Sequence, residues 1–375
     1  MKRKIPFSLL ALLGILLVGV GLFGLWNGPN LCQYVYAPGS VPAGEILEKM
    51  EKAMEGAAGG ISLHATSDGI NLTAAGGGQG DIHLIQTAGS YTEIYPRAWH
   101  SGRPISRADA AEGHRVIVLD EELAFRMFRD QDPLGQRIKI LEQDYEVVGV
   151  ASHRRRIGDR QELTAWIPLG LEGAPAADNM ILTIPGGRGG SLQTLFENSA
   201  RESAGDGSSW DLEKEKIRGT VLAQAVAMVT GVWLLARWIR KLKAWTSGQI
   251  SRIREKARSC YPRQMAGYFI FRALGMLAAW GAVIAAGAGI ALWASRLMLI
   301  FPEWVPENFL SSDSWIARFR SLTAAFADPV QRRTAEIIEI RFWSGLIRWG
   351  IAAVLLGLLL RKNSRKGTES DSGIA

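Results

Sequence analysis

Residues 115–150 read RVIVLDEELAFRMFRDQDPLGQRIKILEQDYEVVGV, and this stretch decides the fold of the part of the chain around it. The continuous apolar run from Val116 to Leu119 predicts a strand that is buried on both faces. Asp120 follows the run and is a favourable N-cap residue for a helix over residues 121–128. The stretch therefore begins as a strand followed directly by a helix.

The second half of the same stretch has the pattern of a hairpin. Asp132-Pro133-Leu134-Gly135 has the composition of a turn. Residues 136–140 and 145–150 are two strand-like runs separated by the polar Glu142-Gln143-Asp144, which predicts two antiparallel strands. Gly149 lies near the exit of the second strand.

The flanking sequence adds further short elements. Apolar residues at helical spacing predict a helix over residues 44–56, and an amphipathic helix is predicted at 192–200. Additional strands are predicted at 61–65, 81–86, 165–169 and 180–184. The succession of strand, helix, hairpin, strand, strand and helix is typical of a compact α+β domain.

Four long apolar runs lie outside this domain, at residues 6–24, 219–236, 273–295 and 342–360. Each has the roughly 20 residues that a helix needs to cross about 30 Å of hydrocarbon. The fourth contains Arg348, which is costly at the centre of a bilayer but sits near enough to one end to snorkel outward. The alternative for this run is a buried helix of a soluble hairpin.

The charges predict which side each segment occupies. The chain has a formal net charge of +7, but acidic residues outnumber basic ones between the first and second runs. Basic residues gather at the N-terminus, between the second and third runs, and in the C-terminal tail, so all three are predicted to be cytoplasmic. This segregation argues against nucleic acid as a partner and predicts a multi-pass protein of the cell membrane with both termini in the cytoplasm.

The predicted organisation has eight segments. They are an N-terminal transmembrane anchor (1–26), an extracytoplasmic domain (27–217), a second transmembrane helix (218–236), a basic cytoplasmic loop (237–267), a third transmembrane helix (268–297), an outer amphipathic segment (298–341), a fourth transmembrane helix (342–361) and a cytoplasmic tail (362–375). The outer segment contains an apolar stripe at helical spacing that includes Trp315. It is interpreted as an interfacial helix, with packing against the outer domain as the alternative.

Several of these residues resemble a known family. The core of the resemblance is Gly102, Arg103, Asp109, Asp132, Pro133, Leu134, Gly135 and Gly149, together with the strand at 116–119 and the run Tyr145-x-Val147-Val148-Gly149-Val150. The chain resembles the MacB-like periplasmic core domain and the FtsX-like ABC transporter permeases. The order of one span, one outer domain and three spans extends the resemblance. It implies a membrane α-helical protein of four transmembrane helices with an extracytoplasmic α+β domain of the MacB periplasmic-core type.

The resemblance also implies partners. A permease-like subunit of this kind couples a separate cytoplasmic ABC ATPase to a shape change of its outer domain, for export or for work on the cell envelope, and it pairs with itself or with a related permease. Family members commonly carry a basic Arg-x-x-Glu-Ile-Gly-type run between the second and third spans, which engages the ATPase. This chain has a degenerate version of that motif, and its candidate ATPase-contact residues are Arg252, Arg254, Glu255, Lys256 and Arg258. These residues also fit a role in orientation and in contact with anionic lipid headgroups. The weakness of the motif leaves a second hypothesis, a membrane scaffold or sensor that keeps the fold without ATPase coupling.

We find no pattern typical of an enzyme. No Gly-x-x-x-x-Gly-Lys-Ser/Thr phosphate loop occurs in the sequence, so energy is expected to come from a separate subunit. The five histidines have no partner at metal-ligand spacing, and we expect no catalytic, cofactor or metal site. Cys32 and Cys260 fall on opposite sides of the membrane, and Cys32 is expected to be a free thiol rather than a lipidated one. The triplet Arg154-Arg155-Arg156 is interpreted as a solvated loop, with contact to an anionic partner as the alternative.

Overall fold

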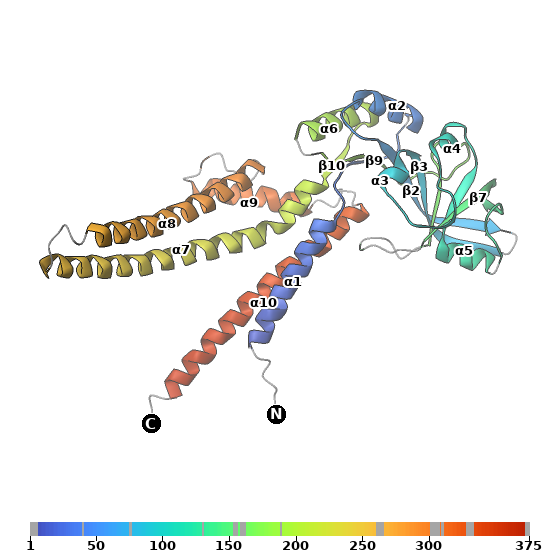
Figure 1. Cartoon of the computed structure of the whole chain (residues 1–375). Coiled ribbons are helices and arrows are strands. Elements are labelled where there is room, and N and C mark those ends of the chain that lie inside the picture. The colour runs from blue at the N-terminus through green and yellow to red at the C-terminus, as the bar shows by residue number, and fades with distance from the viewer. Residues whose placement is uncertain are drawn as a thin grey trace. The chain divides into compact units, whose positions relative to one another are not determined.

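A computed structural model describes residues 7–371 apart from residues 40, 75–76, 130, 153–156, 158–162, 188–189, 260–265, 301–307, 309–310 and 328–333. The chain divides into two compact units, residues 1–219 with 329–375 and residues 220–328. The first contains the outer domain with two long helices (Figure 1). The second contains the remaining long helices.

The outer domain is built on a ten-stranded sheet, part of which closes on itself. β2 (Ser62–Ala74), β3 (Gly77–Gly89), β8 (Leu163–Pro168), β5 (Val116–Asp120), β7 (Gln143–Ala151) and β6 (Arg137–Ile140) pair in that order, and β6 returns to pair with β2. Closure removes free strand edges from this part of the sheet. The apolar residues that this ring encloses pack with α5 (Glu121–Phe128) in one core. The predicted strand, helix and hairpin of residues 116–150 are confirmed.

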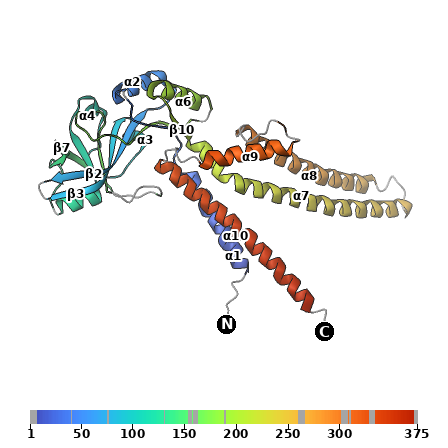
Figure 2. The ribbon, with the colours of Figure 1, turned by 180° about the vertical axis from the view of Figure 1, so that it is seen from behind.

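The rest of the sheet extends from β2 through β9 (Asn179–Pro185) and β1 (Leu31–Tyr36) to β10 (Gly207–Asp211). α2 (Ala43–Ala53) and α6 (Gly190–Ala204) contact each other and this part of the sheet (Figures 1 and 2). A second core lies between the helices and the strands. The short elements α3 (Tyr91–Ile94), β4 (Trp99–Gly102) and α4 (Arg107–Ala111) follow β3 in the chain, and β4 forms the far edge of the sheet beside β7.

Asp120 occupies the predicted N-cap position, but its side chain makes no capping hydrogen bond to the helix. The side chain is 5 % exposed and lies at the end of a buried strand. The expectation that this carboxylate caps α5 is wrong, whereas the position of the boundary is right. Asp109 is the residue of the outer domain that completes a capping box, at the start of α4.

Two helices of the first unit are long and apolar enough to cross a membrane. α1 (Phe7–Asn27) and α10 (Ala335–Asp371) lie side by side (Figures 1 and 2). Their backbones approach closely at glycines, because an added Cβ at Gly14 would lie 2.5 Å from the carbonyl oxygen of Gly350. At Gly24 it would lie 2.2 Å from the ring of Trp343. Small residues permit this kind of close helix packing in membranes.

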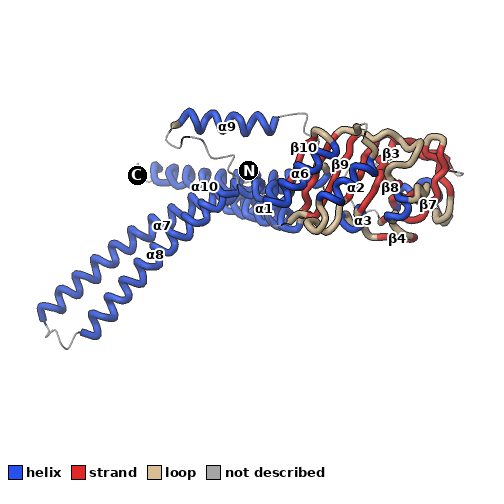
Figure 3. The backbone as a smooth tube through the Cα atoms, turned by 90° about the horizontal axis from the view of Figure 1, so that it is seen from above, coloured by secondary structure: helices blue, strands red, loops and turns tan. Residues whose placement is uncertain are grey.

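The second unit holds most of α7 (Leu212–Ser259), α8 (Ala266–Ile300) and α9 (Ser312–Ala327), and Figure 3 shows α7 and α8 side by side. α7 and α8 supply the other two candidate spans. Residues 237–259, predicted as part of a cytoplasmic loop, continue α7 as helix. Lys, Arg, Leu and Ala are good helix formers, and the first proline after residue 219 is Pro262.

α9 agrees with the helical spacing predicted for the outer amphipathic segment, and the side chains of Trp315 and Ile316 are 44 % and 50 % exposed. Its place at a membrane interface stays a prediction. Trp304, Cys260, His153 and the triplet Arg154 to Arg156 lie outside the described residues.

Candidate functional site

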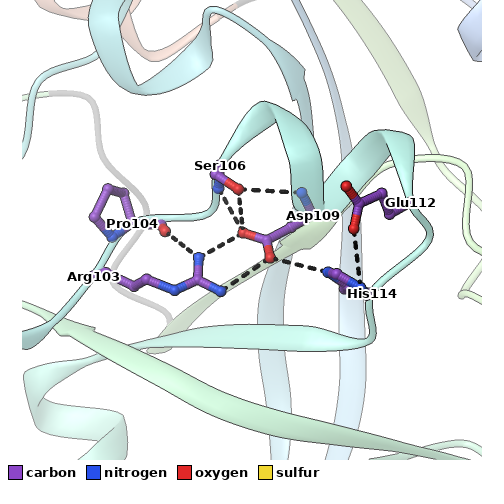
Figure 4. A network of polar contacts seen from close by, with 6 residues as sticks. All are labelled: Arg103, Pro104, Ser106, Asp109, Glu112 and His114. Carbon is purple, nitrogen blue, oxygen red and sulfur yellow. Dashed lines mark hydrogen bonds and ion pairs between the residues drawn. The ribbon is translucent and has the colours of Figure 1, made fainter.

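The residues that carry the sequence motif meet around one buried carboxylate. Asp109 is 3 % exposed and accepts two hydrogen bonds from the guanidinium of Arg103, at 2.6 and 3.0 Å. It also accepts from the backbone N–H and the hydroxyl of Ser106, at 2.8 and 2.7 Å. His114 Nδ1 lies 3.5 Å away (Figure 4). The carboxylate thus ties the loop before α4 to the helix itself.

Close backbone contacts hold this loop against the sheet. The N–H of Arg103 donates to the carbonyl oxygen of Val148 at 2.9 Å. A Cβ at Gly149 would lie 2.3 Å from the carbonyl oxygen of Arg103. Gly102 has a φ of +74°, and a Cβ there would lie 2.3 Å from the Val148 oxygen. Both glycines are therefore required by geometry, one for close approach and one also for its backbone conformation.

The predicted turn docks on the same strand. Asp132 Oδ1 accepts from the N–H of Leu134, the pattern of an Asx turn. The N–H of Gly135, whose φ is +72°, donates to the carbonyl oxygen of Val147 at 2.9 Å. A side-chain methyl of Leu134 lies 2.8 Å from the position of a Cβ at Gly102. The turn and the Arg103 loop therefore pack together against β7.

The electrostatics of this cluster fit a structural role. The hydrogen bonds from Arg103 hold the pKa of the Asp109 carboxyl well below its usual range, and the same pair raises the pKa of Arg103. An ionised carboxylate with its acceptor sites filled by Arg103 and Ser106 has no proton to give or take near neutral pH. The motif residues predicted from the resemblance thus form a joint of the fold rather than a reactive centre.

A second cluster joins the start of α10 to the outer domain, and we call it the outer junction: Gln33, Tyr95, Thr183, Thr334 and Glu336. Gln33 is fully buried in β1 and its amide nitrogen donates to the hydroxyl of Tyr95 at 3.0 Å and to Glu336 Oε2 at 3.1 Å. The hydroxyl of Thr334 donates to Gln33 Oε1 at 2.7 Å. The Tyr95 and Thr183 hydroxyls lie 3.0 Å apart. One amide therefore connects the sheet to the first turn of a candidate membrane helix.

Aromatic packing supports the outer junction from the side of the domain. The ring of His64 lies edge-on to Tyr91 and Tyr95, with centroids 5.3 and 5.4 Å away. Burial lowers the pKa of His64 to about 3, so the ring is neutral at physiological pH. Burial, reinforced by Glu336, raises the pKa of Tyr95, so its hydroxyl stays protonated. The His64 ring and the Tyr95 hydroxyl therefore keep their protonation states across the physiological pH range.

The beginning of α7 is bound to the same region. Lys216 is 9 % exposed and donates from its ammonium to the carbonyl oxygen of Gly28 at 2.5 Å and to Asn30 Oδ1 at 2.7 Å. These acceptors follow the end of α1. Gly219 faces Ser344 of α10, because a Cβ at Gly219 would meet the Ser344 hydroxyl. α1, the first turns of α7 and α10 therefore converge beneath the sheet.

The sequence did not predict the outer junction. Its residues are far apart in the chain, with 301 positions between Thr334 and Gln33. The one available signal is a polar glutamine inside the apolar run LCQYVY, which marks either a solvent-facing position or a buried hydrogen bond. Nothing in the local pattern identifies its partners.

The candidate ATPase-contact residues lie together near the end of α7. Arg252, Arg254 and Glu255 are exposed, and Lys256 and Arg258 belong to the same helix. Within the described residues, no group of three or more His, Cys, Asp and Glu side chains has a geometry that holds a metal ion. The Cys32 thiol is free and 4 % exposed, and burial raises its pKa to about 12.

Comparison with known proteins identifies a domain family that matches the outer domain. Residues 27–200 match the model of the MacB-like periplasmic core domain. A probable export ATP-binding/permease protein of Pseudomonas fluorescens is 31 % identical over 90 residues, which cover 24 % of this chain and 14 % of that relative. The chain thus matches only a small part of the relative's length.

Solved structures of similar domains come from several bacteria. The periplasmic region of MacB from Actinobacillus actinomycetemcomitans aligns with 17 % identity and a TM-score of 0.41, covering 52 % of this chain and 93 % of that one. The extracellular domain of the noncanonic ABC-type transporter YknZ from Gram-positive bacteria aligns with 14 % identity and a TM-score of 0.35, covering 46 % and 90 %. The family-model match covers the outer domain, and four helices are long and apolar enough to span a membrane. The chain therefore combines a domain that matches the MacB-like periplasmic core domain, at residues 27–200, with four candidate membrane helices.

Proposed function

We propose that this protein is a permease-like subunit that couples a separate cytoplasmic ABC ATPase to a shape change of its outer domain. The observation that carries the proposal is the continuity of α7. This helix starts directly after β10 of the outer domain and runs for 48 residues to Ser259. At 1.5 Å per residue it is about 70 Å long, more than twice the thickness of the hydrocarbon core. One continuous helix thus runs from the end of the domain to the basic residues 252–258.

The contacts of the outer junction support the step in which movement of the helices reaches the outer domain. Gln33 connects the sheet to α10, and Lys216 connects the start of α7 to the end of α1. Displacement of these helices is therefore passed to the sheet through buried hydrogen bonds rather than through a loose linker. Work of this kind, in which energy released in the cytoplasm changes a shape outside, needs no channel through the chain.

The energy source in this proposal is a second polypeptide. The sequence contains no phosphate-binding loop, and the exposed Arg252 and Arg254 offer a surface for the ATPase. The charge pattern supports an orientation in which both termini and this surface lie in the cytoplasm and residues 27–217 lie outside. A homodimer or a pair with a related permease completes the assembly, and anionic lipid headgroups are further partners of the basic segment.

Affinity purification of the full chain from its own organism tests the proposal. Co-purification of an ABC ATPase is expected, together with its loss from the variant Arg252→Gln/Arg254→Gln/Arg258→Gln. The control is Arg137→Gln/Lys139→Gln, which removes exposed positive charge from β6 of the outer domain. Retention of the ATPase by the triple variant would exclude this surface as the contact.

A scaffold or sensor without ATPase coupling is the second candidate, and one observation favours it. The stretch Ser251 to Gly275 is a degenerate version of the cytoplasmic motif expected for coupled permeases. If this candidate holds, no ATPase copurifies with the unmodified chain and no ATPase gene lies beside its gene. These two observations separate the candidates without knowledge of the cargo.

A further inference from the structure

Arg348 is a positive charge inside a candidate membrane span. It lies within the apolar segment Ala335–Leu360 of α10, and its side chain is exposed. The face that packs against α1 is occupied by Trp343, Ile347 and Gly350, so the guanidinium is turned away from α1. A charged side chain at this depth is costly unless an anion or water reaches it, and such residues mark functional sites.

The chain offers no carboxylate for Arg348 within the membrane. The sequence has no Asp or Glu in residues 7–27, 216–254, 256–302 or 340–368, which include all four apolar runs. This holds whichever spans pack against α10. An anion that meets Arg348 at this depth would therefore come from outside the apolar runs of this chain.

Arg348 belongs to a repeated pattern. Arg341-Phe342 and Arg348-Trp349 are two Arg-aromatic pairs seven residues apart, which places the two arginines nearly in line along α10 and the two aromatic residues in a neighbouring line. Phe342 and Trp349 are 46 % and 75 % exposed. The guanidinium of Arg341 lies 6.0 Å from the ring centroid of Trp210, next to the outer domain. We call these four residues the Arg-aromatic face.

The direction of α10 indicates which leaflet of the bilayer the Arg-aromatic face contacts. Thr334 and Glu336, at the start of α10, are bonded to Gln33 of the outer domain. Helical side chains lean toward the N-terminus of their helix. Arg348 therefore leans toward the domain side, about 10 Å along the axis below Arg341. Arg341 therefore lies nearer the headgroup region, and Arg348 lies deeper, in the half of the hydrocarbon on the outer-domain side.

We propose that the Arg-aromatic face binds an anionic phospholipid of the leaflet on the outer-domain side. The Arg348 guanidinium donates to the phosphate, because a guanidinium fork matches phosphate oxygens in a bidentate way. Phe342 and Trp349 pack along the acyl chains, and Arg341 adds positive charge at the headgroup. A carboxylate on a neighbouring membrane helix is the competing occupant. The outward lean of Arg348 and the exposed rings beside it favour a lipid.

Native mass spectrometry of the full chain, purified with equal amounts of phosphatidylglycerol and phosphatidylcholine, tests this inference. The unmodified chain is expected to retain phosphatidylglycerol in preference to phosphatidylcholine. Arg348→Gln lowers that retention about fivefold, as expected for the loss of one cation near an anionic headgroup. Arg348→Lys retains the charge and part of the preference. Arg137→Gln is the matched control, because it removes the same charge from an exposed position on β6 of the outer domain.

Three results would overturn the inference. They are equal retention of the two lipids by the unmodified chain, equal phosphatidylglycerol retention by Arg348→Gln and Arg137→Gln, and loss of a protein partner from Arg348→Gln with lipid retention unchanged. The last is the result that a partner carboxylate predicts. If Arg348→Gln does not fold, Trp349→Ala probes the same face at unchanged charge, and its phosphatidylglycerol retention must fall for the inference to stand.

Discussion

Removal of the Asp109 carboxylate is expected to loosen the joint between the Arg103 loop and β7. In Asp109→Ala, Arg103 loses both acceptors of its bidentate pair and Ser106 loses its capping box. The hydrogen bond from the Ser106 N–H to the carboxylate is lost, at a cost of about 1 kcal/mol, whereas the Ser106 hydroxyl still caps the helix. The charge-assisted hydrogen bonds contribute about 2 kcal/mol after allowance for the half-exposed Arg103 side chain. The local free energy of opening should fall by about 3 kcal/mol, which is roughly a 100-fold faster exchange.

Hydrogen exchange of the full chain, resolved to the peptides that contain residues 100–112 and 143–151, measures this change. Glu112→Ala is the control, since Glu112 also contacts a histidine but is 63 % exposed. Folding lowers the pKa of Asp109 from its ordinary value of 3.8, so the contribution of the carboxylate to stability is present above about pH 4 and is lost as pH falls below that value. Exchange that is the same in both variants at pH 7 would refute the structural role assigned to the carboxylate.

Three further changes test the packing. Gly149→Ala places a methyl group 2.3 Å from a backbone carbonyl oxygen, so yield of folded protein should fall sharply, and a normal yield would contradict the geometry. Gly21→Ile in α1 should lower the midpoint of thermal aggregation in detergent by several degrees, whereas Gly19→Ile, with open space around it, should not; equal midpoints would argue against the α1–α10 contact. In a chain with Cys260→Ser, Cys32 should resist maleimide at pH 8 until the protein is unfolded, because its pKa of about 12 leaves little thiolate. Rapid labelling of the folded chain would show that the thiol is accessible.

Much of the fold follows from local sequence patterns. Strand β5, helix α5 and the β6–β7 hairpin were predicted within a few residues, because each combines an apolar periodicity with turn residues at its ends. β1 and β10 were not predicted. Every residue of β1 is buried, including Gln33, so no alternation is visible, and β10 is short and polar.

The candidate site likewise has one part that the sequence predicted and one part that it did not. Gly102, Arg103, Asp109 and Gly149 were predicted from the family pattern, and the structure explains them by a close backbone approach and a buried ion pair. The outer junction was missed because its members come from strands, loops and a helix separated by up to three hundred residues. Long-range hydrogen bonds leave no periodic trace in the sequence.

The long separation within the outer junction has a consequence for biosynthesis. The sheet is complete once Asp211 has been made, so the outer domain can fold while the later helices are still being synthesised. Gln33 is then part of a folded domain before Thr334 and Glu336 have been synthesised, because they lie 301 and 303 residues later in the chain. Until the last helix inserts, the Gln33 amide has its hydrogen bond to Tyr95 but lacks those to Thr334 and Glu336. The junction thus distinguishes the completed chain from a truncated one, in which two of the three hydrogen bonds cannot form.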